Sequence, residues 1–491
     1  MEVRSIVPRE APASVTSPVR AHLTDGSTVV YPRGFRVDGD TVHGNGFRYA
    51  AGSSVSVSSS FVVLDSVVGM ETYQDNLREA PTILASTAAT AVGIAGTVVL
   101  LKAIFGSCPT FYSDSAGVPV LEAEGFSYSI APLFEQRDVD RLRATPDSRG
   151  YVTLAVRNEA LETHYINSLV LLAAQHDADE FVAPDESGYP LALRGLTALT
   201  SARDRAGRDV APVFAAADGN VFSTDARTIA AATANDLDDY IDLTMPAGES
   251  DSVAVLLRMR NSLLNTVLLY QQILGDPGAH SLDWVGHSLQ QISGALDMGR
   301  WYTDRMGMRV SVEENGKYRE VSRIADTGPI AFHDVAVLVP VPPGARRDSV
   351  HVRLSFVADE WRIDRVQFAN RYRRPATRTI PASTVVTSDP AQNASALRDL
   401  SEPDEHYVVT SPGQSFTIAF DAGRSPDNTH QTFFIVSQGY YTEWVRGSWI
   451  KAASGKGFTP GDGALVDALH RWRSEQPTLE HEFYSTRIPV K

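Results

Sequence analysis

The 491-residue sequence contains a single cysteine, Cys108, which excludes an intramolecular disulfide and any site built from several thiolates. It also lacks an excess of positive charge, because 44 basic residues against 59 acidic ones leave a net charge of -15. Binding to nucleic acid requires a basic surface that displaces phosphate counterions, so we expect no nucleic-acid partner. The hydrophobic fraction of 43% is nevertheless that of a chain with packed cores.

Familiar catalytic and cofactor motifs are missing as well. The sequence has no GxSxG, HExxH or CxxC motif, no EF-hand loop and no dinucleotide-binding fingerprint. Gly455-Lys456-Gly457 does not form a phosphate loop, because a glycine rather than serine or threonine follows the lysine. The sequence therefore predicts a protein that is not an enzyme and that has neither a cofactor nor a metal site.

The N-terminus lacks the apolar core of a secretory signal, and Pro8, Pro12 and Pro18 interrupt it. An uncharged 20-residue run appears instead at Thr82–Leu101. At about 1.5 Å per residue, a helix of this length reaches about 30 Å, the thickness of a bilayer core. We predict a transmembrane helix within residues 81–106, which would also serve as the insertion signal. A buried alanine-rich helix in a soluble core is the alternative.

Small residues recur every four positions in this run and would share one helix face. Such a stripe lets a second transmembrane helix approach closely, which predicts other membrane-protein subunits as partners besides the lipid bilayer itself. The predicted helix-packing interface consists of Ala85, Ala89, Gly93 and Thr97. We expect a bacterial inner-membrane protein with a cytoplasmic N-terminus and a large periplasmic C-terminal region.

The remaining sequence favours a mainly β fold. Alternating residues punctuated by Asp25-Gly26 and Asp38-Gly39 predict a small β-barrel within residues 1–80. After the span we expect a β-rich domain at 107–257, a helical insertion at 258–306 and a β-sandwich portion at 307–370. Residues 371–491 are expected to form a C-terminal β-rich region with a terminal helix at Gly463–Ser474.

Three stretches resemble known families. Ser107–Ser113, SCPTFYS, and Asn158–Asn167, NEALETHYIN, resemble two motifs of uncharacterised membrane-anchored bacterial proteins. That resemblance implies a large β-rich domain behind a single span and no activity. Trp361–Val366 is similar to a late strand of the jelly-roll in galactose-binding-like domains, which implies jelly-roll-like sandwiches.

Two groups of polar residues are candidates for chemistry. His176, Asp177, Asp179 and Glu180 carry cation-binding side chains, although a solvated turn explains their crowding better. His333 and Asp334 form a potential acid–base pair by composition. Neighbouring residues of a strand point to opposite faces, however, so we do not expect this pair to act together.

Charge is unevenly distributed along the chain. Residues 173–251 contain 15 acidic and 5 basic residues, a balance that suits either a basic soluble partner or an ordinary solvated surface. A run of arginines follows the predicted sandwich and is either a linker or an anchor for acidic groups. We take Arg371, Arg373 and Arg374 as possible partner-docking residues.

These features together predict a non-catalytic, single-span accessory subunit of a multi-subunit bacterial membrane complex. Bioenergetic assemblies, such as a photosynthetic reaction centre with its antenna, are examples of such complexes. The alternative is a membrane-anchored surface protein that binds glycans or proteins, for which Trp361, Trp444 and Trp449 are the candidate contact residues.

Overall fold

The computed structural model describes most of the chain outside the predicted span. The described residues are 2–6, 11–16, 19–23, 27–49, 56–74, 108–129, 135–160, 162–268, 272, 301–302, 304–342, 349–388, 390–404, 406–423, 430–443 and 461–485. None of the helices in these ranges is long and apolar enough to cross a bilayer. The predicted span at 82–101, with its stripe of small residues, lies outside them.

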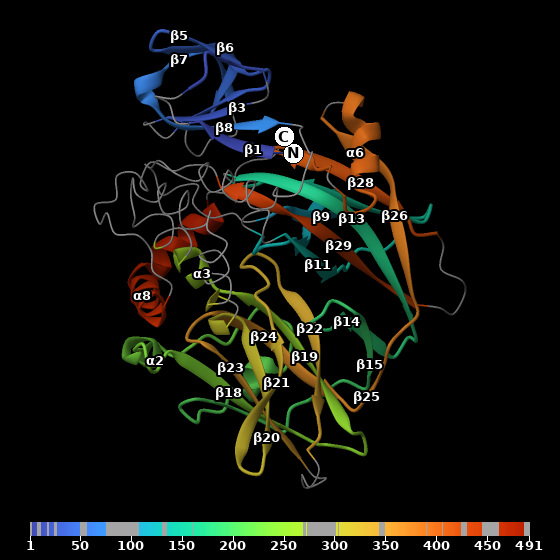
Figure 1. Ribbon diagram of the computed structural model, residues 1–491. Helices are drawn as coiled ribbons and strands as arrows, with labels where there is room; N and C mark the ends of the chain where they lie inside the picture. The colour runs from blue at the N-terminus through green and yellow to red at the C-terminus, as the bar shows by residue number, and fades with distance from the viewer. Residues whose placement is uncertain are drawn as a thin grey trace.

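The described residues are mainly β-strands, which confirms the predicted fold class at that level. An eight-stranded antiparallel sheet forms the N-terminal unit, drawn in blue in Figure 1, and pairs in the order β1-β8-β3-β4-β6-β5-β2 with β7 beside β6. Its strands are β1 (Glu2–Ile6), β2 (Ser14–Val15), β3 (Val19–Leu23), β4 (Thr28–Tyr31), β5 (Phe35–Asp38), β6 (Thr41–Tyr49), β7 (Ser56–Val63) and β8 (Val67–Gln74).

Two glycines of β6 are required by the packing of this unit. A Cβ atom at Gly44 or Gly46 would come within 2.6 or 2.8 Å of the Tyr31 ring, which is fully buried in the core. The strand continues through Gly44-Asn45-Gly46, with a register shift between His43 and Gly46.

A second unit consists of two layers around one apolar core. Strand β26 bridges the layers, since its first half pairs with β13 and its second half with β28. The core between the layers contains Phe111, Leu154, Leu171 and Phe420. The strands are β9 (Thr110–Ser115), β10 (Val118–Glu124), β11 (Gln136–Arg141), β12 (Tyr151–Arg157), β13 (Glu162–His176), β26 (Thr377–Thr387), β27 (Val408–Thr410), β28 (Ser415–Asp421) and β29 (His430–Glu443).

The chain between β13 and β26 forms a third unit, in which a four-stranded and a five-stranded sheet enclose the largest apolar core. A small sheet, β14-β15-β25, lies beside them. The strands are β14 (Glu180–Pro184), β15 (Pro190–Arg194), β16 (Thr197–Ala198), β17 (Ser201–Asp204), β18 (Asp238–Met245), β19 (Ser252–Asn261), β20 (Met308–Glu314), β21 (Lys317–Ile324), β22 (His333–Pro340), β23 (Val350–Val357), β24 (Trp361–Ala369) and β25 (Arg371–Arg373).

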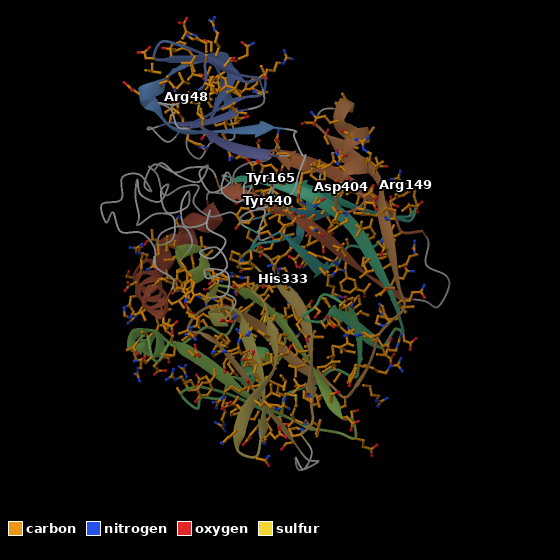
Figure 2. The ribbon with its side chains drawn as sticks, viewed as in Figure 1. Arg48, Arg149, Tyr165, His333, Asp404 and Tyr440 are labelled. Carbon is orange, nitrogen blue, oxygen red and sulfur yellow. The ribbon has the colours of Figure 1, made fainter. Side chains whose placement is uncertain are left out.

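These units differ from the domain boundaries expected from the sequence. The boundary at 257/258 falls inside β19, which continues as a strand to Asn261. The arginine run is not a linker, because it lies on β24, β25 and β26. The second and third units meet along an apolar contact that includes Val139, Val182 and Phe434, and His333 lies between them in Figure 2.

Helices are few among the described residues. They are α2 (Ala226–Ala231), α3 (Leu264–Thr266), α6 (Asn393–Asp399) and α8 (Asp462–Ser485), with 3-10 helices at Leu64–Ser66, Ala211–Phe214 and Pro390–Gln392. The expected C-terminal helix is confirmed and is longer than predicted. The helical insertion is described only at α3, residue 272 and residues near 301–306.

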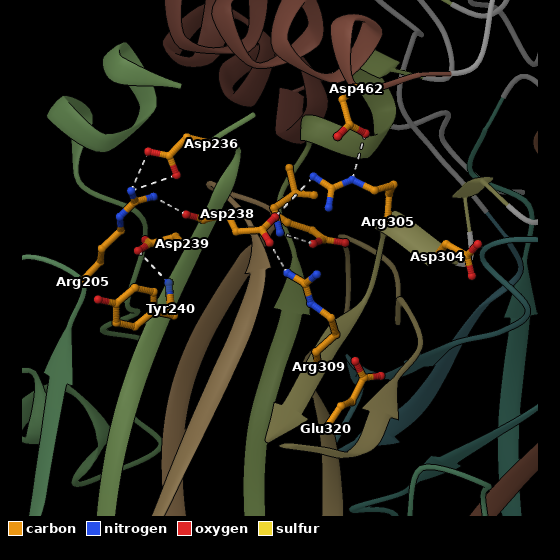
Figure 3. Close-up of polar contacts among 12 residues, drawn as sticks. Arg205, Asp236, Asp238, Asp239, Tyr240, Asp304, Arg305, Arg309, Glu320 and Asp462 are labelled. Atoms are coloured by element: carbon orange, nitrogen blue, oxygen red, sulfur yellow. Dashed lines mark hydrogen bonds and ion pairs between the residues drawn. The ribbon is translucent and has the colours of Figure 1, made fainter. Parts of the chain in front are cut away.

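Helix α8 packs on the third unit through apolar and polar contacts. Its buried face contributes Leu465, Leu469 and Trp472 to one core cluster. At its start, Asp462 lies 3.0 Å from Arg305, whose guanidinium also lies 3.4 Å from Asp238 (Figure 3). These contacts fix the helix against β18 and β20.

Candidate functional site

A cavity of about 190 Å³ lies where the second and third units meet. Five stretches line it: residues 126–129, 136–141, 184–188, 324–327 and 333–335. Its rim is exposed, for example at Arg137 and Glu186, whereas Asp140 and His333 are buried in its wall. The cavity therefore has an open mouth and a polar interior.

Strand β11 supplies two carboxylates to the cavity. Asp138 and Asp140 are two positions apart, so their side chains point to the same face of the strand. The carboxylate of Asp138 accepts hydrogen bonds from the backbone N–H groups of Phe126, at 3.1 Å, and Val139, at 2.8 Å. These contacts fix its orientation.

His333 begins β22 and forms an ion pair with Asp140 through Nδ1. Its Nε2 lies 3.9 Å from the Oε1 atom of Glu124, a fully buried residue at the end of β10. The same oxygen accepts hydrogen bonds from the backbone N–H groups of Ile330 and Ala331, at 2.7 and 3.0 Å. Strands from two units thus position one carboxylate–imidazole cluster.

Three atoms of this cluster lack a hydrogen-bond partner within the described part of the chain. They are Oε2 of Glu124, Oδ2 of Asp140 and Nε2 of His333. Buried polar atoms are normally paired, because leaving one unpaired costs about 1–3 kcal/mol. Asp140 and His333 line the cavity, so their unpaired atoms lie where a bound group would reach them.

Burial and neighbouring charges shift the pKa values of Asp138, Glu124 and His333. Burial, reinforced by the charge of Asp140, raises the pKa of Asp138 to about 7. Burial also raises the pKa of Glu124. For His333 burial opposes protonation, but the charge of Asp140 and its contacts with Asp140 and Glu124 prevail and raise its pKa well above the ordinary value.

A second polar network lies in the part of the cavity wall that contains Tyr128 and Asp326. Asp326 accepts hydrogen bonds from Tyr302 and Asn261, both at 2.9 Å. The hydroxyl of Tyr128 donates to Asn261 at 2.8 Å. Burial and the charge of Asp326 raise the pKa of the neighbouring Glu360 well above its ordinary value, which favours the protonated form of that carboxyl.

Of the remaining acids of the cavity, Asp185 and Asp334 are neutralised by arginines and Glu186 is exposed at the rim. Asp185 pairs with Arg374, and Asp334 pairs with Arg258 at 3.3 Å and Arg365 at 3.1 Å. By contrast, no arginine or lysine forms a salt bridge with Asp138, Asp140 or Asp326 in the described ranges, although Arg137 and Arg141 line the same cavity.

The structure brings together the two charged regions that the sequence analysis treated separately. Arg373 donates to Glu180 at 2.9 Å, and Arg374, besides Asp185, donates to the carbonyl oxygen of Tyr189. Two of the three predicted partner-docking arginines thus support the acidic segment that forms one cavity wall. Arg371 is exposed on β25.

The acidic turn after β13 is not a metal centre. Arg194 pairs with Asp177 and lies 3.2 Å from Asp179, while His176 contacts Thr432 at 3.0 Å. Within the described ranges, no group of three or more His, Cys, Asp or Glu side chains has the geometry to hold a metal ion. The turn is stabilised by these ion pairs.

The two motifs of the family resemblance contact each other. The backbone N–H of Cys108 donates to Glu162 at 2.6 Å, and Tyr112 donates to Glu159 at 2.8 Å. Next to them, Arg20 of the N-terminal unit donates to Thr163 at 2.7 Å. These motif residues join the first unit to the second, and Cys108 is buried there.

The tryptophans proposed for glycan contact are not available in the described structure. Trp361 is fully buried in the core of the third unit. Trp444 and Trp449 lie outside the described residues. The opposite orientation of His333 and Asp334 is consistent with the sequence analysis, since they contact different partners, Asp140 and two arginines.

The shifted groups predict that stability falls as the pH rises from about 4 through about 7 and falls further as His333 loses its proton. Asp138 in the folded chain retains its proton between about pH 4 and about pH 7, so deprotonation there favours unfolding. The stabilisation by His333 is complete below about 6.5 and is lost as the pH rises through its higher folded pKa. Melting temperatures measured by circular dichroism should decline over this range.

Asp138→Asn provides the control for this prediction, because it removes one of the two titrations. The variant should show a flatter decline between about pH 4 and about pH 7 and keep the decline above it. A melting temperature that rises steadily toward alkaline pH would contradict the assignment of both groups.

Comparison with known proteins gives no relative of established function. No family model matches the chain, and no curated protein matches it. Among solved structures, a GH31 α-xylosidase from Xanthomonas citri aligns with 88% of this chain at 11% identity, with a TM-score of 0.17. The chain spans 38% of that enzyme's length, and so low a TM-score does not indicate a shared fold.

Proposed function

We propose that this chain is a non-catalytic accessory subunit that binds a basic protein partner within a bacterial membrane complex. The observation that carries the proposal is the acidic cavity between the second and third units. Residues 81–106 would anchor the chain in the inner membrane, with the cavity on the periplasmic side. A photosynthetic reaction centre with its antenna is one assembly of this type.

The size of the cavity favours a single side chain over a whole small molecule. Sites for small molecules usually measure about 300–1,000 Å³, whereas this cavity holds about 190 Å³. At about 30 Å³ per water, that is the space of about six water molecules. Protein interfaces commonly place one anchor residue in a pocket of this kind.

The charge of the cavity favours a basic anchor. Asp138, Asp140 and Asp326 form no salt bridge with an arginine among the described residues, although Arg137 and Arg141 line the same cavity and His333 supplies one further positive charge at most. The wall at residues 184–188 belongs to the acidic region 173–251, for which a basic soluble partner was one of two interpretations. Such a field also accelerates the encounter with a positively charged surface.

Affinity purification from detergent-solubilised membranes tests this function. The parent chain should retain membrane subunits, and Asp138→Asn combined with Asp326→Asn should reduce their recovery about tenfold, which corresponds to about 1.4 kcal/mol. Raising the salt concentration should weaken recovery with the parent, because exposed charges are screened.

Asp251→Asn is the matched control, since it removes one exposed acid outside the cavity. It should recover the same subunits as the parent. Circular dichroism must show that the double variant remains folded. Equal recovery with the folded double variant and with the parent would refute the role of the cavity.

A further inference from the structure

We infer that the cavity between β11 and β22 is built to receive the guanidinium group of an arginine. This inference rests on the proposed function, because it specifies the chemical group that the partner inserts. It concerns the carboxylates of Asp138, Asp140 and Asp326 and the buried pair of Asp140 with His333.

The arrangement of acceptors favours a planar group with several donors. Asp138 and Asp140 line the cavity from one strand, and Asp326 lines it from the segment after β21. The Oδ2 atom of Asp140, in a side chain that is only 4% exposed, has no hydrogen-bond partner among the described residues. A guanidinium offers five N–H donors in a rigid fork, whereas an ammonium offers three around one point.

The cost of removing the cation from water points to the same group. A charge that enters a partly buried site loses hydration, and a guanidinium is more weakly hydrated than an ammonium. The protein already packs arginines in this way beside the cavity. Arg141 and Arg365 both lie over the ring of Phe181, at 4.4 and 5.2 Å from its centroid.

Charge balance leaves little room for more than one added cation, because Arg137 and Arg141 also line the cavity. Glu124, Asp138 and Asp140 lie around His333, which already pairs with Asp140. Among the other charged groups of the walls, Asp185 and Asp334 have arginine partners, Arg141 donates to the carbonyl oxygen of Val182, and Arg137 and Glu186 are exposed at the rim. One guanidinium would compensate the charge that Asp138 acquires on losing its proton.

Binding should consequently release a proton. The charged form of Asp138 becomes favourable once a fixed positive charge lies beside it. At about pH 6, a fraction of the chains should lose that proton on binding, and at about pH 9 none should. If these acids had only a structural role and bound no ligand, adding the peptide would release no proton.

Isothermal titration of the full chain in detergent with three blocked tripeptides tests the inference. The probes are Ac-Gly-Arg-Gly-NH2, its lysine analogue and its citrulline analogue, which has the shape of arginine without the charge. We expect the arginine peptide to bind at least about tenfold more tightly than the lysine peptide, and the citrulline peptide to give no heat of binding. Titrations in two buffers of different ionisation enthalpy should reveal the released proton.

Single substitutions in the cavity test whether the arginine peptide binds there. Asp138→Asn and Asp326→Asn should each weaken the arginine peptide about tenfold, whereas Asp251→Asn should leave its affinity unchanged. Undiminished binding to either cavity variant would overturn the inference. So would equal or tighter binding of the lysine peptide.

The outcome can be separated from that of the proposed function. If no peptide binds but the membrane partner is still lost with Asp138→Asn and Asp326→Asn, the arginine inference fails and the accessory role stands. If the arginine peptide binds at the cavity but the partner is recovered equally with parent and variants, the site stands and the accessory role fails.

Discussion

Replacement of Trp472 by alanine should destabilise the docking of helix α8 by about 3–5 kcal/mol, the usual cost of truncating a buried tryptophan. The side chain is fully buried between α8 and the third unit. Its Nε1 donates to Asp359 at 2.6 Å, and that carboxylate also pairs with Arg362. The variant would lose both the packing and a charge-assisted hydrogen bond.

Hydrogen exchange of the α8 amides measures this effect without assuming that the whole chain unfolds in one step. At about 1.4 kcal/mol per decade, exchange should accelerate by roughly a hundredfold to a few thousandfold. Trp472→Phe should show a smaller acceleration, because it keeps one aromatic ring in the core, although it loses the donor and part of the indole volume. Arg473→Ala, an exposed neighbour on the same helix, should exchange like the parent.

Removing one partner of the buried Asp140–His333 pair should be comparably severe. Asp140→Asn leaves the imidazole of His333 without its carboxylate in a wall where it is only 8% exposed. Breaking such a pair typically costs about 3–5 kcal/mol, because the remaining charge is buried and uncompensated. Thermal unfolding followed by circular dichroism should show the loss as a lower melting temperature.

The double variant Asp140→Asn with His333→Gln separates this mechanism from simple loss of packing. With both charges gone, the cavity contains no stranded imidazolium, so the double variant should be more stable than Asp140→Asn alone. If the two substitutions are additive, the pair contributes no coupling and the electrostatic explanation is wrong.

Local patterns predicted many strands well. The sequence alternates at Tyr151–Val156, where the structure has β12, and the Glu314–Lys317 turn that joins β20 to β21 has Asn315 and Gly316 at positive φ. These features depend on neighbours in sequence, which the sequence displays directly. The C-terminal helix was found for the same reason, from leucines and Trp472 at helical spacing.

The order of strands within the sheets was not accessible in this way. Strand β13 pairs with β26 and β29, which follow it by a long stretch of chain, and nothing in its own sequence specifies those partners. The expected boundary at 257/258 therefore fell inside β19. Local alternation fixes which face of a strand is buried, but not which strand lies next to it.

The candidate site was missed for a related reason. His333 was examined with Asp334, its neighbour in sequence, whereas its partners Asp140 and Glu124 come from other strands. One signal was present, since Asp138 and Asp140 place two acids on one face of a strand. Their proximity to a histidine depends on the packing of two units.

The nesting of the third unit within the second has a consequence for the order of folding during synthesis. The ends of the inserted segment adjoin, because Ala174 pairs with Thr377 and the N–H of Gln175 donates to Ala376 at 2.9 Å. The ribosome releases the whole insert before β26–β29 exist. Until those strands are synthesised, both edges of β13 are unpaired and open to mispairing with other strands. The inserted unit, by contrast, can already complete its own core.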